Sequence, residues 1–205
     1  MNHKSKKGFT LLELLIVIGI MAVLATAATI VLNPAQLLAQ ARDSQRISDM
    51  DALKAALALY LTDVLTPDLN GGLADSPGCD SGITGQPYIA VAPTTNSFQR
   101  TGANAVDADR TIDGTGWLPV NLSSVSGGSP LAVLPIDPTN TGNNVYRYAC
   151  NQTAKTFELN ACLESTKYLQ KMVEDGGDRG SVSITAGCGT GAGAGFYEVG
   201  TTLTL

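Results

Sequence analysis

The chain has 205 residues, of which 44% are hydrophobic and 15% charged, with a formal net charge of −5. That length suits one domain of ordinary size with an appendage, and the low charged fraction excludes a disordered, solvated chain. The acidic balance argues against a nucleic-acid partner, because phosphate binding needs a basic face. Glycine and proline are concentrated after Thr66, so a turn-rich part follows an N-terminal part that is poor in helix breakers.

The first element follows a short basic segment. Residues 1–8 contain three lysines, and residues 9–32 contain Glu13 as their only ionisable side chain. An apolar run of this length can cross a bilayer as a helix. Lysines before it favour a cytoplasmic N-terminus and an exported C-terminal part. We therefore expect one membrane-spanning helix.

A cleaved secretory signal is the alternative interpretation of the same segment. A basic start, an apolar core and small residues up to Ala27 fit its three regions. Glu13 opposes this, because a carboxylate inside an apolar helix costs about 2.5–3.5 kcal/mol. In this alternative, the chain would be a secreted, disulfide-bonded adhesive or ligand-binding module released after about Ala27.

A second helical pattern runs from Ala35 to about Leu65. One apolar stripe recurs at helical spacing, at Met50, Leu53, Leu57, Tyr60, Leu61 and Val64. We expect the charged residues to lie mostly on the other faces: Arg42, Asp43, Arg46, Asp49, Asp51 and Lys54. Pro34 should kink the helix or loosen the preceding turn, and Thr66-Pro67 should end it.

The remainder predicts a small antiparallel sheet with long loops. Strands are expected at 88–92, 145–150, 156–163 and 196–199, and the second and third form the clearest hairpin. Alternation in the third strand places Phe157 and Leu159 on the core face, with Glu158 and Asn160 on the other face. No nucleophile or phosphate-loop motif occurs, so an enzyme is not expected.

The four cysteines predict disulfides. Cys79, Cys150, Cys162 and Cys188 all lie in the part expected outside the cytoplasm, where an oxidising setting permits disulfides. No Cys-x-x-Cys spacing occurs, and the only histidine, His3, lies within residues 1–8. A zinc site is therefore not expected.

The hairpin register limits which cysteines can pair. If Asn151 pairs with Thr156 around a four-residue loop, Cys150 and Cys162 point to opposite faces of the sheet. Such side chains cannot form a disulfide. We therefore expect each to pair outside the hairpin, with the other two cysteines as partners in an order left open. A bulge or an odd-length loop would restore the local pair.

The segment 6–15, KKGFTLLELL, resembles the class III signal of the prepilin superfamily, the precursors of type IV pilins and type II secretion pseudopilins. The resemblance implies cleavage by a prepilin peptidase between Gly8 and Phe9, N-methylation of Phe9, and an assembly role for Glu13. Looser similarity to the major pseudopilin and related pilins lies at 134–138 and 146–148, and further similarity to bacterial pilin-like proteins at 175–178 and 197–200.

The resemblance also implies partners and a location. The partners would be copies of the chain, related minor pilins, the prepilin peptidase and an inner-membrane assembly platform. The protein would be a single-pass protein of the inner membrane with its head outside the cytoplasm, and later part of a cell-surface or periplasmic fibre. No nucleic acid is evident as a partner.

Calcium is a further expectation from the resemblance, because major pseudopilins bind it near the end of their sheet. The candidate ligands are Asp137, Asp175 and Asp178, since calcium prefers carboxylate and carbonyl oxygens on flexible loops. A solvated acidic loop is the simpler interpretation of these residues. No other cofactor is expected.

These observations predict an α+β, pilin-like fold, with a long N-terminal helix packed on a small antiparallel sheet. The expected parts are a leader peptide (1–8), an apolar helix for the membrane and the fibre core (9–33), an amphipathic helix (34–66) and a loop-rich β head (67–205). The expected function is that of a structural subunit of a type IV pilus or a type II secretion pseudopilus.

Overall fold

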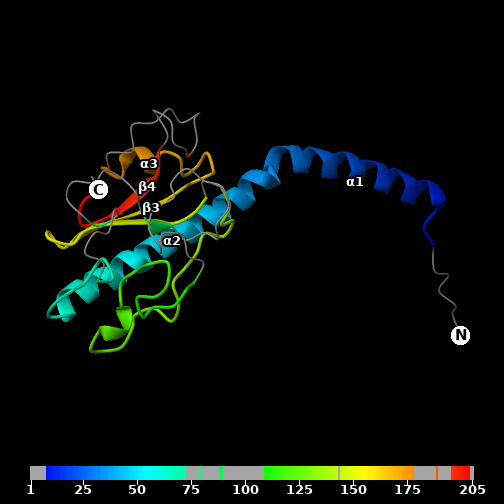
Figure 1. Ribbon diagram of the computed structural model, residues 1–205. Coiled ribbons are helices and arrows are strands. Elements are labelled where there is room, and N and C mark those ends of the chain that lie inside the picture. The colour runs from blue at the N-terminus through cyan, green and yellow to red at the C-terminus, as the bar shows by residue number, and fades with distance from the viewer. Residues whose placement is uncertain are drawn as a thin grey trace, which may run out of the picture. The chain divides into compact units, whose positions relative to one another are not determined.

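A computed structural model describes residues 8–72, 79, 88–89, 109–142, 144–177, 188 and 195–203. The described elements follow the order α1 (Leu11–Leu32), α2 (Pro34–Asp63), β1 (Tyr88–Ile89), η1 (Leu122–Ser124), β2 (Arg147–Asn151), β3 (Thr156–Ala161), α3 (Lys171–Glu174) and β4 (Tyr197–Gly200) (Figure 1). Long helical N-terminal elements and a small antiparallel sheet confirm the expected α+β class.

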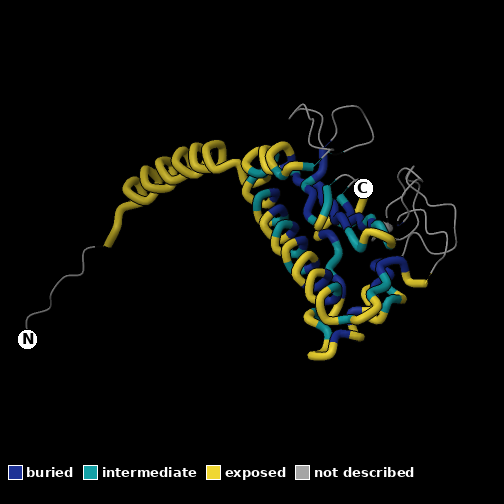
Figure 2. The backbone as a smooth tube through the Cα atoms, turned by 90° about the vertical axis from the view of Figure 1, so that its left-hand side faces the viewer, coloured by how far each residue is buried: buried dark blue, intermediate teal, exposed yellow. Residues whose placement is uncertain are grey.

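The chain divides into two compact units, residues 1–38 and residues 39–205, and the second is called the head below. In the first unit, α1 is exposed along its whole length (Figure 2). It is also long and apolar enough to cross a bilayer. Its side chains therefore find no packing partner within the described part of this unit.

Asn33 alone separates α1 from α2. Its φ of 40° lies in the left-handed region, which ends α1. Its carbonyl oxygen accepts hydrogen bonds from the backbone N–H groups of Gln36 (3.0 Å) and Leu37 (3.3 Å), which begins α2. Pro34 takes the first helical position, where its missing N–H is not needed. The disturbance expected at Pro34 is thus a complete helix end and a restart.

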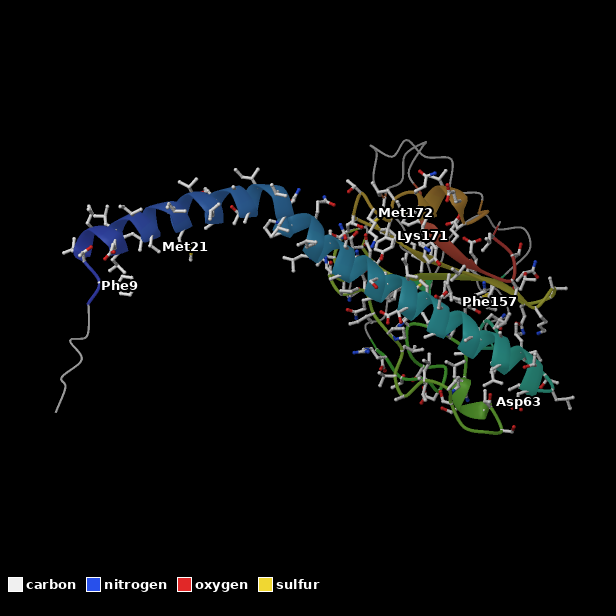
Figure 3. All side chains as sticks on the ribbon, turned by 180° about the vertical axis from the view of Figure 1, so that it is seen from behind. Phe9, Met21, Asp63, Phe157, Lys171 and Met172 are labelled. Carbon is white, nitrogen blue, oxygen red and sulfur yellow. A yellow bond between two sulfur atoms is a disulfide. The ribbon has the colours of Figure 1, made fainter. Side chains whose placement is uncertain are left out.

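In the head, α2 buries the predicted apolar stripe. Met50, Leu53 and Leu57 are fully buried, and Tyr60 is 3% exposed. These residues form one core cluster with sheet residues, among them Phe157, which Figure 3 labels beside α2. The helical phase inferred from the sequence is therefore confirmed for this stripe.

Asp43 and Arg46 are also buried, both with no exposed surface. The expectation that the charged residues lie mostly on the other faces of α2 is wrong for these two. They extend the stripe toward the N-terminus with alternating spacings of three and four residues, from Ala39 through Met50. Their burial is tolerated because they pair with each other and with groups far along the chain, as described below.

The sheet is an antiparallel meander in the order β1-β2-β3-β4. In its central hairpin Asn151 pairs with Thr156 and Cys150 with Phe157, which is the register used for the parity argument. Each strand lies within or close to its predicted range. The first is shorter than expected, with Tyr88–Ile89 assigned out of the predicted 88–92.

Both faces of β3 are buried. The second face, expected to be solvated, contains Glu158 and Asn160, which are 1% and 2% exposed. Arg147 and Glu198 occupy the positions that pair with Asn160 on the two neighbouring strands, and they are buried as well. The guanidinium of Arg147 lies 4.3 Å from the centroid of the Phe196 ring. The burial of this second face depends on residues far away in the sequence, so it cannot be predicted from the alternation within one strand.

Two disulfides connect the hairpin to distant segments. Cys150 is joined to Cys79, and Cys162 is joined to Cys188. Both hairpin cysteines thus pair outside the hairpin, as the parity argument requires. The structure supplies the order of partners that the sequence left open.

Candidate processing and assembly site

The segment before α1 is extended and accessible. Gly8, Phe9 and Thr10 precede the first helical turn, and the side chain of Phe9 is 90% exposed (Figure 3). A Cβ atom added at Gly8 would meet nothing within 4 Å. The packing of the described chain therefore does not require glycine at this position, so a requirement for it would come from another molecule.

Glu13 closes a capping box at the start of α1. Its Oε2 atom accepts hydrogen bonds from the backbone N–H and the hydroxyl of Thr10, both at 2.9 Å. The backbone N–H of Glu13 donates to the Thr10 hydroxyl oxygen at 3.2 Å. Glu13 Oε1 makes no hydrogen bond within the described residues. A carboxylate here is favourable for the helix, because it meets the positive end of the helix dipole.

A second polar cluster lies in the head, around Arg46. Its Nε and NH2 atoms donate to the two carboxylate oxygens of Asp137 at 2.6 and 2.9 Å. Its NH1 atom donates to Asp43 at 2.8 Å, and its NH2 atom also forms an ion pair with Glu164 at 2.5 Å. Burial alone lowers the pKa of the guanidinium, but the bonds to Asp137, Glu164 and Asp43 outweigh it and raise the pKa.

The same cluster holds the segment that follows β3. Asp43 accepts hydrogen bonds from the backbone N–H groups of Glu164 (3.0 Å) and Ser165 (2.7 Å). Glu164 in turn forms two hydrogen bonds with the guanidinium of Arg42, at 3.1 and 2.6 Å. This bonding to Arg42, together with Arg46, holds the pKa of Glu164 below its usual range. The cluster therefore ties α2 to two loops as a structural element.

The candidate calcium ligands have other partners where they are described. Asp137 is bound to Arg46 and accepts a hydrogen bond from the backbone of Thr139 at 2.8 Å. Asp175 accepts from the backbone N–H of Glu198 at 2.8 Å, on the edge strand β4. Among the described residues, no group of three or more acidic, cysteine or histidine side chains is placed to hold a metal. Asp178 lies outside the described residues, so the calcium site stays a prediction.

The Arg46 cluster is the feature that sequence reasoning missed. A signal for it exists in the spacing, because Asp43 and Arg46 sit on the stripe that Met50 and Leu53 continue. A buried pair of opposite charges at this position indicates further partners elsewhere in the chain.

Comparison with known families finds a match at the N-terminus. Residues 3–29 match the family model described as the prokaryotic N-terminal methylation motif. This is the prepilin-type signature of type IV pilins and pseudopilins, and it contains Gly8, Phe9 and Glu13. No curated protein and no solved structure matches the chain. The resemblance seen in the sequence is thus confirmed, and the motif marks a prepilin-type substrate of a peptidase.

Proposed function

We propose that the chain is the precursor of a structural subunit of a type IV pilus or a type II secretion pseudopilus. A prepilin peptidase cuts between Gly8 and Phe9, and the new N-terminus at Phe9 is methylated. The apolar helix α1 then holds the subunit in the membrane until it is assembled into a helical fibre. The observation that carries this proposal is the prepilin-type motif at residues 3–29, which places Gly8 and Phe9 directly before an exposed apolar helix.

Gly8 supports the processing step. Its position is open, so its own chain would accept a side chain there, whereas a peptidase that binds the segment in an extended form would not. The secretory alternative is less well supported. Its cleavage point after Ala27 lies inside α1, which continues without interruption to Leu32.

Glu13 supports the assembly step. A carboxylate in an apolar segment is costly unless it is paired. In the precursor, Thr10 supplies that partner through the capping box. In a fibre, the amine freed at Phe9 of a neighbouring subunit is the natural partner, because it adds a charge of opposite sign.

N-terminal sequencing of the mature protein tests the processing step. The chain is expressed with and without a prepilin peptidase, and the peptidase should remove residues 1–8 and leave a methylated Phe9. The control is Gly8→Val, which leaves the described structure undisturbed but should block cleavage. A mature N-terminus near Ala28 would instead support the secreted module.

Shearing separates the two kinds of fibre. Cells are sheared, and the protein is quantified in the released surface fibres and in the envelope. Recovery in surface fibres supports the pilus, whereas confinement to the envelope, with loss of secretion on deletion, supports the pseudopilus. A processed subunit found in neither kind of fibre would contradict the proposal.

A further inference from the structure

Two Asn-x-Ser/Thr tripeptides lie in the head, at residues 121–123 and 151–153. This spacing is the acceptor sequence for N-linked glycans in exported proteins, in which the sugar is attached to the asparagine amide. The tripeptide alone is a weak signal, because it occurs often by chance. The folded surroundings of each asparagine therefore decide between the two, and the structure gives them different surroundings.

Asn121 presents its amide to solvent. The residue is exposed and caps the short helix η1, and its Oδ1 atom accepts a hydrogen bond from the backbone N–H of Ser123 at 3.1 Å. Its Nδ2 atom makes no hydrogen bond within the described residues. Leu122, between these two exposed residues, is fully buried and anchors the turn. The fold thus directs both polar groups of the acceptor, the amide and the Ser123 hydroxyl, away from the core.

The bond to Oδ1 also assists the chemistry of the Asn121 amide. An amide nitrogen is a poor nucleophile, because its lone pair is delocalised into the carbonyl group. A hydrogen bond to the carbonyl oxygen stabilises negative charge there, so the Nδ2 protons become more acidic and one is lost more easily as the nitrogen attacks. The donor of this bond is Ser123, the hydroxyl residue of the same tripeptide.

The second tripeptide lacks this arrangement. Asn151 is half-buried at the end of β2, where it pairs with Thr156 in the sheet. Its Oδ1 atom accepts a hydrogen bond from the backbone N–H of Ala154 at 2.8 Å, one residue beyond the tripeptide. The amide of Asn151 is thus engaged in the hairpin turn, and its partial burial restricts the approach of a transferase.

We propose that Asn121 is a site of N-linked glycosylation and that Asn151 is not. The co-reactant is a glycan carried on a lipid pyrophosphate. Nδ2 forms a bond to the anomeric carbon of the glycan, and the bond from that carbon to the pyrophosphate oxygen breaks. The lipid pyrophosphate leaves with the electron pair, and a base of the transferase takes one Nδ2 proton. Asn121 Oδ1 keeps its hydrogen bond to Ser123 in the product.

The glycan would stand at the C-terminal end of α2. Ser126, in the same loop as Asn121, donates two hydrogen bonds to the carboxylate of Asp63, the last residue of α2, at 2.6 and 2.7 Å (Figure 3). Asp63 lies about 36 Å along α2 from Ala39, where the head begins, at about 1.5 Å per residue. A bulky sugar there leaves the start of the head uncovered. The proposal goes beyond the proposed function and does not depend on it.

Peptide mapping tests the proposal on the full chain purified from the cells that encode it. After reduction and alkylation, trypsin cuts after Arg110, Arg147 and Lys155, so that residues 111–147 carry only the first tripeptide and residues 148–155 only the second. Peptide 111–147 should carry a glycan, and an amidase that releases N-linked glycans should convert Asn121 to aspartate. Peptide 148–155 should be unmodified. A bare peptide 111–147, or a glycan on peptide 148–155, would overturn the proposal.

Two substitutions at one position supply the matched control. Ser123→Ala removes the hydroxyl and keeps the backbone N–H that binds Asn121, so the glycan should be lost while the head stays folded. Ser123→Thr keeps a hydroxyl and should keep the glycan. A glycan that persists in Ser123→Ala would contradict N-linked transfer to Asn121. Glycosylated subunits that form no fibre would contradict the proposed function and leave this proposal intact.

Discussion

Removing the guanidinium of Arg46 tests the idea that the head depends on a buried ion-pair cluster. Arg46 has no exposed surface and bonds to Asp137, Asp43 and Glu164 at distances of 2.5–2.9 Å. In Arg46→Ala, Asp43 and Asp137 remain buried without their cation. Breaking a buried pair in this way costs about 3–5 kcal/mol. That is a large part of the total stability of a domain of this size, which is about 5–15 kcal/mol.

The assay is equilibrium unfolding in guanidinium chloride of the chain from Ala35 onward, with both disulfides intact. The head should unfold in one cooperative transition, because it forms a compact unit of its own. Arg42→Ala is the matched control, since its side chain is 36% exposed and its ion pair with Glu164 is partly solvated. This control should cost below about 1 kcal/mol.

A double-mutant cycle separates the ion pair from simple packing. Replacing both Arg46 and Asp137 by alanine should cost less than the sum of the two single changes, because no unpaired charge is left between them. If Arg46→Ala lowers the free energy of unfolding by no more than Arg42→Ala does, the buried ion pairs of the cluster do not stabilise the head.

Three further predictions follow from the geometry. Leu57→Ala should lower the free energy of unfolding by about 2–5 kcal/mol in the same assay, because Leu57 is fully buried. Leu59→Ala, at a 43% exposed position of α2, should lower it much less. Equal losses would show that the buried face of the helix is wrongly assigned. The pKa of Glu164 is lowered from 4.5 in the folded head, so the carboxylate stabilises the head above pH 4.5, and this stabilisation is lost as the pH falls through the lowered pKa. Glu164→Gln should flatten that part of the plot of stability against pH. An unchanged plot would contradict the stabilising role of the Glu164 carboxylate. Glu13→Ala should leave the subunit cleaved and held in the membrane but poorly incorporated into sheared fibres, whereas a normal fibre yield would exclude its assembly role.

Local periodicity was enough to predict much of this fold. The apolar run of α1, the buried stripe of α2 and the hairpin register all follow from spacings of a few residues. The parity of the hairpin also indicated that Cys150 and Cys162 pair elsewhere. The choice between Cys79 and Cys188 depends on how distant loops return to the sheet, and no local pattern carries that information.

The features that sequence reasoning missed are long-range. Asp137 lies 91 residues after Arg46, and Glu164 lies 121 residues after Asp43, so neither pairing has a local signature. The burial of Glu158 on the second face of β3 has the same origin, because its cover comes from other parts of the chain. The sequence signal for such long-range pairing is a charged residue at a position of an otherwise apolar helical stripe.

The two units of the chain differ in where their apolar side chains find packing partners. The described head contains its own core, its two disulfides and its ion pairs. The surface of α1, by contrast, is left for lipid or for other subunits. Changes in the two units should therefore separate experimentally. Leu57→Ala should lower the stability of the head and reduce fibres only as far as it depletes folded subunit. Glu13→Ala should reduce fibres while the unfolding curve of the head, measured in the full chain in detergent, stays unchanged, because the hydrogen bonds described for the Glu13 side chain are to Thr10. A shift of that curve caused by Glu13→Ala would mean that α1 contributes to the stability of the head and would contradict this separation.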